Sequence, residues 1–456
     1  MRSPACTTGA PRTAADLAEL EASYQPFAGA AAWRRTHVDE PRLSGYAGVL
    51  SRAVAASATR PGDAGSPVGT DLAEVKDRLL RVASLDSMAL DDLLPANPEL
   101  TSVVLASAID GGAEGAEDTG AIDAVAECQR QALVLASEAA TAGRAVDVQL
   151  IAVLQDVITK TQVSYTVTTD QGDSVEVALP RGQYKPVSNY LRQPDGRLAA
   201  FAPADQVAAE MDRLVGELGS AAFAGLHPVV QAAYAHYALT AIHPFADANG
   251  RLARTVASIY LIRFCGLPLL VFADQWPGYY QALREATQRR RGQALVDFFA
   301  AAAVAAMDLA ASLLSPPGEP LGQGGGDASA ERAPGEVDEA AAGLLAAVAA
   351  ELRQLVVSPS LDVSLAVTPS RPDHAEPGYR LVAGAGLRFA VRGRRAPVDL
   401  EFVPLASEMR DDLLPVAVRE VRTGALFEAA FADAYPLVLP STAIRARLWL
   451  RRLLAQ

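Results

Sequence analysis

The sequence predicts a mainly α-helical core with a short strand insert, followed by a flexible linker and a small α+β domain. Apolar residues recur at helical spacing through most of residues 71–314, as on amphipathic helices. Residues 315–336 contain almost no large apolar side chain, so they cannot bury enough surface to offset their ordering entropy. The chain of 456 residues is therefore expected to hold roughly two or three domains.

The first 70 residues are expected to form a helical and partly flexible lead-in. It ends in residues 58–70, which read ATRPGDAGSPVGT, a cluster of proline, glycine and serine. The N-terminus has no apolar stretch of the signal-peptide kind. The cysteines Cys6, Cys128 and Cys265 lie far apart without CxxC spacing, which fits a reducing compartment. We therefore expect a cytoplasmic protein.

The charge and the apolar windows bear on the partners. The net charge of −13 opposes binding to phosphate backbones and anionic membrane surfaces, so neither nucleic acid nor a membrane is an expected partner. The most apolar window, residues 296–314, is mostly alanine and carries Asp308. We interpret it as a packed core helix and not as a membrane span.

Helical periodicity defines the core, residues 71–314. Helices are expected from residue 71 onward and at 122–141, 146–161, 204–218, 228–242, 250–264, 277–288 and 292–314. Residues 162–201 interrupt this period and are typical of two β-hairpins, which turn around Gln171-Gly172 and around residues 194–196.

The C-terminal domain is expected over residues 337–456. It begins with a helix at 338–355, continues through alternating segments such as LDVSLAVT and PVDLEFVPL, and ends in a helix that contains RARLWLRRLLAQ. No motif in this domain reveals its role.

The chemistry is concentrated in residues 243–254, which read HPFADANGRLAR. Pro244 cannot continue the incoming helix and Asn249 is a favoured N-cap residue, so the polar stretch is predicted to be a tight turn between two helices. The start of the second helix presents unpaired N–H groups and a partial positive charge, which together attract phosphates.

The side chains of this turn suit phosphate chemistry. Arg251 and Arg254 lie on one helical face and can reach the same oligophosphate. Gly250 lets the backbone approach a ligand closely, and Asp247 is a hard oxygen ligand suited to Mg²⁺. His243 has a pKa near neutrality and can take a proton from an attacking hydroxyl.

This segment resembles the signature of the Fic family, His-x-Phe-x-Asp/Glu-Gly/Ala-Asn-Gly-Arg-x-x-Arg, at every required position. The resemblance implies that His243 is the general base and that Asp247 holds the metal. It implies that Arg254 grips the γ-phosphate and that Phe245 is an apolar anchor. The residues implied to bind the α- and β-phosphates are Asn249, Gly250 and Arg251. Ala248 replaces the commoner glycine, which would cost about 1 kcal/mol at positive φ.

The resemblance extends over roughly residues 94–314 and implies a helical bundle with a β-hairpin flap. GQYKPVSNYL resembles the segment that opens the flap, a hairpin that takes up the target polypeptide as an added strand. The implied flap residues are Asn189, Tyr190 and Leu191. Tyr279 and Tyr280 resemble an aromatic pair that contacts the nucleobase or sugar, although two aromatics at a helix start also suit a core.

Many members of this family carry an inhibitory helix with a Ser/Thr-x-x-x-Glu-Gly/Asn motif, whose glutamate pairs with the second arginine of the signature. We assign this motif to LASAIDGG, with Ser107 and Asp110 in the regulatory positions after the lead at residues 94–97. Asp110 is one methylene shorter than glutamate, so its pairing with Arg254 is expected to be loose. The alternative is that Asp110 only ends a helix before Gly111.

The sequence thus predicts a protein adenylyltransferase, with ATP as co-substrate and Mg²⁺ as cofactor. Its partner is expected to be a protein with a Tyr, Thr or Ser hydroxyl, and a homodimer is left open. One alternative keeps the site but removes AMP or transfers UMP, phosphate or phosphocholine; Gly250 argues against phosphate transfer, since that branch has lysine there. The other alternative is an interaction scaffold that uses the lead-in and the C-terminal domain.

Overall fold

The computed structural model describes residues 19–58, 71–91, 120–168, 174–192, 198–272, 275–314, 334–356, 364–370, 379–382, 386–392, 398–407, 416–421, 426–429, 446 and 449–450. The chain forms two compact units. The first comprises Met1–Val38 and Lys76–Ala303, and the second comprises Asp39–Val75 and Val304–Gln456.

The first unit is a helical bundle, which confirms the predicted mainly α fold. Its helices are α3 (Leu72–Leu90), α5 (Gly120–Thr141), α6 (Val148–Ile158), α7 (Val207–Leu218), α8 (Ala221–Ala224), α9 (Pro228–Ile242), α10 (Asn249–Cys265), α11 (Trp276–Arg289) and α12 (Gln293–Leu314), of which α3 and α12 each extend into the second unit. The predicted helices agree with these bounds to within a few residues, and the short α8 was not predicted.

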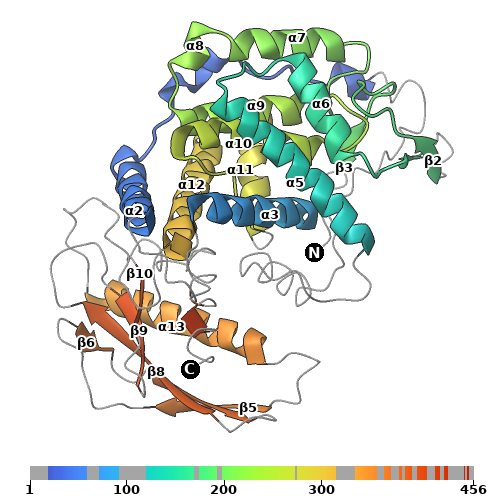
Figure 1. Ribbon diagram of the computed structural model, residues 1–456. Helices are drawn as coiled ribbons and strands as arrows, with labels where there is room; N and C mark the ends of the chain where they lie inside the picture. The colour runs from blue at the N-terminus through green and yellow to red at the C-terminus, as the bar shows by residue number, and fades with distance from the viewer. Residues whose placement is uncertain are drawn as a thin grey trace. The chain divides into compact units, whose positions relative to one another are not determined.

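Helices α9 and α10 form the centre of this bundle (Figure 1). Helix α10 packs against α9, α5 and α6, while α7 and α11 contact α9. From Val229 to Leu239 every α9 residue except Gln231 is buried, so this helix is apolar on all sides. The loop between α9 and α10 is therefore held by rigid elements at both ends.

The strand insert consists of two antiparallel hairpins, as the sequence predicts. Strands β1 (Ser164–Thr168) and β2 (Ser174–Ala178) form the first, and β3 (Tyr190–Arg192) and β4 (Leu198–Ala200) form the second. Tyr165 pairs with Val177 and Val167 with Val175, so alternation along the strands gives the first hairpin one apolar face.

The N-terminal segment differs from the predicted separate lead-in, because residues 19–38 pack on the helical core. Its 3₁₀ helix η1 (Ala30–Arg35) places the buried Trp33 ring 5.2 Å from the ring of Tyr237 and 5.6 Å from that of Tyr234. The backbone N–H of Ala30 donates to Glu217 over 2.9 Å. Helix α2 (Glu40–Ala58) falls in the second unit.

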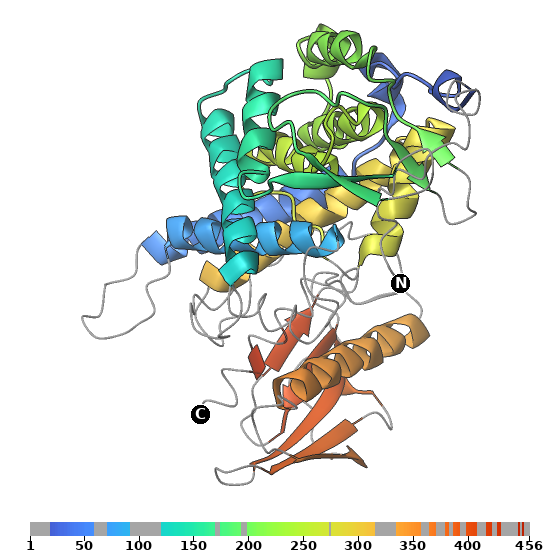
Figure 2. The same cartoon turned by 90° about the vertical axis from the view of Figure 1, so that its right-hand side faces the viewer.

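The second unit contains an antiparallel sheet, with α13 (Pro334–Val356) packed against its β8 and β9 strands (Figure 2). The sheet has the order β10-β9-β8-β7-β5, and β6 pairs with the C-terminal end of β8. The strands are β5 (Ser364–Ser370), β6 (Tyr379–Leu381), β7 (Gly386–Arg392), β8 (Val398–Ser407), β9 (Val416–Glu420) and β10 (Leu426–Ala429). Helix α13 begins at Pro334, within the predicted linker, whose residues 315–333 lie outside the described part.

Trp449 lies against the sheet of its own unit, with its ring 5.7 Å from the rings of both Phe402 and Phe427. Among the described helices, α12 is the one that is long and apolar enough to cross a membrane by length and composition. However, 72% of its most apolar window is buried inside the structure, and Asp308 is among the buried residues. This burial agrees with the predicted core helix.

Candidate active site

The loop between α9 and α10 contains two residues in the left-handed conformation. His243 has φ 54° and ψ 60°, and Ala248 has φ 66° and ψ 18°. For Ala248 this conformation costs about 1 kcal/mol relative to glycine. The cost predicted for an alanine at this position therefore applies, and both ends of the loop are bent sharply.

Asn249 closes the loop through its side chain. Its Oδ1 accepts from the backbone N–H of Phe245 over 3.0 Å, and its Nδ2 donates to the Phe245 carbonyl over 2.8 Å. Helix α10 begins at Asn249 itself and is preceded by Ala248, so the predicted N-cap role is wrong by one position. Phe245 is fully buried, and its ring lies 5.8 Å from that of Tyr184. The loop is thus held in one shape before any ligand binds.

His243 is half-buried, and its ring stacks on Phe201 with a centroid distance of 3.9 Å and an interplanar angle of 11°. Burial lowers the pKa of His243 from 6.5 to about 3, and the charge of Lys185 acts in the same direction. A hydrogen bond with the Thr240 backbone raises this pKa and only partly offsets the other two effects. The imidazole is consequently neutral at physiological pH, which is the form that accepts a proton.

The carboxylate of Asp247 is oriented by two donors, the side-chain amide of Gln162 and the backbone N–H of Ala248, one on each oxygen. A carboxylate offers about four lone pairs, so each oxygen can still bind a cation. No group of three His, Cys, Asp or Glu side chains gathers anywhere in the described residues. A single carboxylate that shares the ion with substrate phosphates and water is a usual arrangement for Mg²⁺, and Asp247 fits it.

Gln155 of α6 links the loop to the start of the flap segment. Its Nε2 donates to the Asp247 carbonyl over 3.3 Å, and its Oε1 accepts from the backbone N–H of Gly182. Gly182 has φ +66°, a conformation that favours glycine. Gln155 is fully buried, so its amide satisfies two backbone groups that water cannot reach easily.

Replacing Gln155 with leucine is expected to lower the free energy of unfolding by about 1–3 kcal/mol, since it leaves two backbone groups without their partner. The thermal unfolding midpoint measures this loss. The matched control is Gln131→Leu, because Gln131 bonds to Glu127 on an exposed helix face. Equal midpoints for the two variants would contradict the role given to Gln155.

The flap segment is anchored to the loop by buried polar contacts. Lys185 Nζ donates to Asn189 Oδ1 over 2.6 Å, and Asn189 Nδ2 donates to the Phe245 carbonyl over 3.2 Å. Tyr190 is also buried, and its hydroxyl contacts Glu21 over 3.3 Å. Asn189 and Tyr190 therefore secure the hairpin with their side chains, while the Leu191 side chain lies outside the described part.

Arg251 and Arg254 share one carboxylate, that of Asp91. Arg254 Nη2 lies 2.8 Å from Asp91 Oδ1, and Arg251 Nε lies 3.2 Å from Asp91 Oδ2. Both arginine side chains are less than a tenth exposed. Burial is the largest influence on Arg254 and lowers its pKa, but Asp91 and Tyr279 together raise the pKa above its ordinary value. Two buried cations beside one carboxylate leave a net positive charge that attracts an anion.

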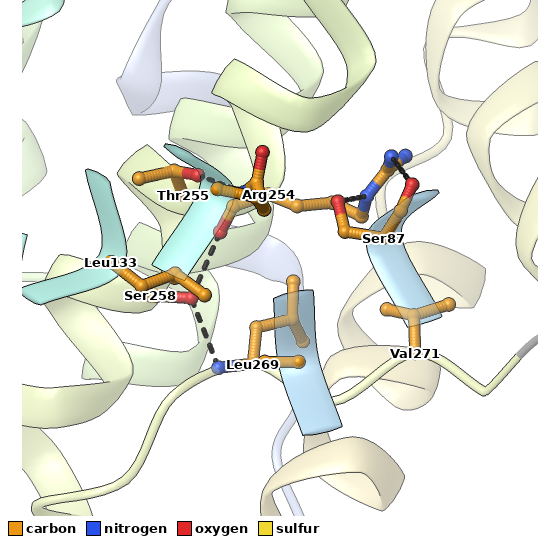
Figure 3. Close-up of a pocket in the computed structure, with 9 residues that line it drawn as sticks. Ser87, Leu133, Arg254, Thr255, Ser258, Leu269 and Val271 are labelled. Carbon is orange, nitrogen blue, oxygen red and sulfur yellow. Dashed lines mark hydrogen bonds between the residues drawn. The ribbon is translucent and has the colours of Figure 1, made fainter. Parts of the chain in front are cut away.

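Ser87 completes the contacts of Arg254 on the side of α3. Its Oγ accepts from Arg254 Nε over 2.9 Å, and its carbonyl accepts from Arg254 Nη2 over 2.8 Å (Figure 3). A cavity of about 10 Å³ lies beside these groups and is also lined by Gln129, Thr255 and Ser258. It has room for about one water molecule, so it is not a nucleotide pocket.

Sequence reasoning missed Ser87 and Asp91. They have the Ser-x-x-x-acid spacing of the inhibitory motif at the end of α3, although Asp92 follows where glycine or asparagine is usual. That spacing could have been found, but the motif was assigned to Ser107 and Asp110 instead. Those two residues lie outside the described part, while Arg254 has its carboxylate partner in Asp91.

The aromatic pair on α11 is divided by the structure. The Tyr279 ring is buried, and its hydroxyl lies 2.7 Å from His236 Nε2 and hydrogen-bonds with Arg254. Tyr280 is half-buried and stacks on Trp276 at 5.0 Å. Tyr279 thus points its hydroxyl into the protein, in contrast to its predicted contact with a base or sugar, and that prediction now rests on Tyr280.

The fold and the loop together define a helical domain whose central helix pair brings together a neutral imidazole, an oriented carboxylate and two buried arginines. Residues 154–261 match the model of the Fic/DOC family. These residues therefore form a Fic domain, and the resemblance inferred from the loop is confirmed over this part of the chain.

Curated relatives include two proteins named protein adenylyltransferase Fic. The one from Drosophila persimilis is 41% identical over 78 residues, and the one from Drosophila melanogaster is 40% identical over 78 residues. The matched segment is 17% of this chain and 15% and 16%, respectively, of those proteins. The similarity thus spans less than a fifth of this chain and less than a fifth of each of these relatives.

Solved structures with a similar fold include a Fic-domain signalling protein from Bacteroides thetaiotaomicron. It is 18% identical, with a TM-score of 0.45, and the match covers 59% of this chain and 96% of that one. Fic-1 from C. elegans is 16% identical with a TM-score of 0.40, and the match covers 60% of this chain and 72% of that one.

Proposed function

We propose that this protein transfers AMP from ATP to a hydroxyl group of another protein. The observation that carries the proposal is the loop from His243 to Arg254. It combines a neutral imidazole, an oriented carboxylate and two buried arginines that share one counter-charge. The curated relatives named protein adenylyltransferase support the same reaction.

In the proposed reaction the acceptor oxygen attacks the α-phosphorus of ATP and its proton passes to His243. A bond forms between that oxygen and the α-phosphorus, the bond to the bridging oxygen breaks, and pyrophosphate leaves. Asp247 would hold Mg²⁺, which neutralises phosphate charge when it is bound. Arg251, Arg254 and the first N–H groups of α10 bind the phosphates, so positioning and charge neutralisation supply most of the rate.

Exposed apolar side chains in one stretch of the chain support a protein as the acceptor. The large apolar residues left exposed in the described part all lie between residues 153 and 187, namely Val153, Val163, Val175, Val177 and Val187. This stretch includes the first hairpin and leads into the flap. Exposed apolar side chains of this kind are typical of contact with another protein where they form one surface.

The label position in ATP separates AMP transfer from phosphate transfer at the same site. AMP transfer places the α-phosphorus on the acceptor and releases the γ-phosphorus, whereas phosphate transfer does the reverse. We expect protein to be labelled from α-labelled ATP and not from γ-labelled ATP. Labelling from γ-labelled ATP alone would overturn the proposal in favour of phosphate transfer.

Asp247→Asn is expected to lower the transfer rate at least about 10-fold, because an amide oxygen is a weaker ligand for Mg²⁺ than a carboxylate. Removal of the metal with a chelator should abolish transfer in the unaltered protein. The matched control is Asp156→Asn, since Asp156 is exposed and pairs with Arg181 at 3.5 Å. An Mg²⁺ dependence of the rate that is the same in the Asp247 variant and the control would remove Asp247 from the site.

We also infer that Ser87 and Asp91 restrain the site. Both hydrogen-bond to Arg254, and Asp91 also pairs with Arg251. A triphosphate that uses these arginines must displace the carboxylate, so the two compete for the same cations. On this proposal the contacts of Asp91 with the two arginines keep the site in a restrained state. Asp91 then has the inhibitory role that the sequence assigned to Asp110.

A further inference from the structure

Tyr279 and His236 add to the contacts that Arg254 makes with Ser87 and Asp91. Tyr279 comes from α11 and His236 from α9, and both side chains are buried. The hydroxyl of Tyr279 is 2.7 Å from His236 Nε2, and it also hydrogen-bonds with the Arg254 guanidinium. Three helices, α9, α10 and α11, thus contribute one residue each to a continuous chain of hydrogen bonds.

The available protons give this chain one direction. A guanidinium has N–H donors and no acceptor, so the Tyr279 oxygen must accept from Arg254. The single hydroxyl proton of Tyr279 is then left to be donated to His236. His236 Nε2 must accept it, which requires a neutral imidazole with its proton on Nδ1.

The surroundings of His236 agree with that assignment. Its ring lies 5.4 Å from the ring of Phe299 and 5.5 Å from that of Tyr279, with no exposed surface. Burial, and to a lesser extent the charge of Arg254, lowers the pKa of His236 to about 3. Its Nδ1 has no hydrogen-bond partner among the described residues, so the polar contact of this histidine is the one made by Nε2.

The contact of Arg254 with Tyr279 differs from its contact with Asp91 in charge. Asp91 carries a charge and would have to leave when phosphate oxygens bind to the guanidinium. Tyr279 is neutral and buried between α11 and α9, so it does not compete with an anion for charge. It can hold the guanidinium in the restrained state and equally in the state that binds nucleotide.

We propose that Tyr279 and His236 are positioning residues that hold the Arg254 guanidinium in place for the terminal phosphates of the nucleotide. This inference rests on the proposed function, because it assigns Arg254 to a nucleoside triphosphate. It replaces contact with the nucleobase as the role of Tyr279. Neither residue touches the reacting atoms.

The test is a double-mutant cycle with Tyr279→Phe and Arg254→Ala, read as dissociation constants for ATP and for AMP. Tyr279→Phe removes one hydroxyl that is bonded to a charged group, so we expect ATP binding to weaken by about tenfold. AMP lacks the terminal phosphates, so its binding should change by less than about twofold. In the Arg254→Ala background, the Tyr279 substitution should have no further effect on ATP.

The matched control is Tyr260→Phe, which removes a hydroxyl from a buried tyrosine of α10 that has no part in the chain. It should leave both dissociation constants unchanged. Equal weakening of ATP and AMP by Tyr279→Phe would instead assign Tyr279 to the base or sugar. A full effect that persists without Arg254 would mean that the hydroxyl only supports the fold, and either result overturns the proposal.

A second measurement does not depend on nucleotide binding. The imidazole nitrogen NMR spectrum of His236 should show a neutral ring with the proton on Nδ1, unchanged between pH 7 and pH 5. A proton on Nε2 would reverse the direction of the hydrogen bond between Tyr279 and His236 and would contradict the proposed series of hydrogen bonds. If the unaltered protein binds no nucleotide, the proposed function fails, and this spectrum still decides whether the chain exists.

Discussion

Replacing His243 with alanine is expected to reduce AMP transfer by at least about 100-fold, which is the lower range for loss of a general base. The neutral imidazole at the end of α9 is the group placed to take the acceptor proton, and alanine cannot do so. The initial rate of α-label incorporation into protein measures the effect. Dissociation constants for ATP should change little, because in the proposed reaction His243 acts on the acceptor and the arginines bind the phosphates.

His37→Ala is the matched control, since His37 is exposed and lies far along the chain from the loop. It should transfer AMP at the rate of the unaltered protein. Should His243→Ala keep a tenth or more of that rate, the imidazole is not the base. A parallel loss of ATP affinity would point to collapse of the loop, whose left-handed start at His243 is the feature at risk.

Replacing Asp91 with asparagine is expected to raise both the affinity for ATP and the transfer rate by about tenfold or more. A hydrogen bond to a charged group contributes about 1.5–3 kcal/mol, and ATP must break the one between Asp91 and Arg254 together with the ion pair between Asp91 and Arg251. The substitution keeps the size of the side chain and removes the charge that competes with phosphate. Isothermal titration and the labelling rate measure the two quantities.

The control for this prediction is Asp77→Asn, the same change on helix α3, which Asp91 directly follows. Asp77 pairs with Arg81 and Arg130 on a half-exposed surface away from the loop, so its replacement should alter neither quantity. Unchanged or weaker ATP binding in Asp91→Asn would mean that Asp91 supports the two arginines and does not restrain them.

The helical core was readable from the sequence because its signals are local. The apolar run of α9, followed by Pro244, predicts the helix that enters the loop. The polar stretch that follows predicts the loop itself. The positive φ of Ala248 was anticipated from the residue usually found at that place. Each of these depends on a few neighbouring residues and on general backbone preferences.

The features that sequence reasoning missed depend on contacts between distant segments. Arg254 hydrogen-bonds with Ser87 of α3 and with Asp91, which directly follows that helix. The sequence of α3 predicts an amphipathic helix but does not show which residues it contacts. The sequence assigned Tyr279 to contact with the nucleobase or sugar because it belongs to an aromatic pair. Its hydroxyl instead hydrogen-bonds with His236, which lies on another helix. Trp33 likewise places the N-terminal segment on the core through ring contacts that no local pattern announces.

Several predictions from the sequence stay predictions. They are the cytoplasmic location, the lack of nucleic-acid and membrane partners, and the homodimer. The helix and sheet of the C-terminal part of the chain agree with the α+β fold predicted there.

The most direct test of the central claim is peptide mass spectrometry of a cell lysate treated with the Asp91→Asn protein, ATP and Mg²⁺. We expect peptides that gain the mass of one AMP on a Tyr, Thr or Ser side chain. These peptides should be absent when Asp91→Asn is combined with His243→Ala. AMP-bearing peptides in equal amounts with both proteins, or peptides that gain only phosphate, would contradict it.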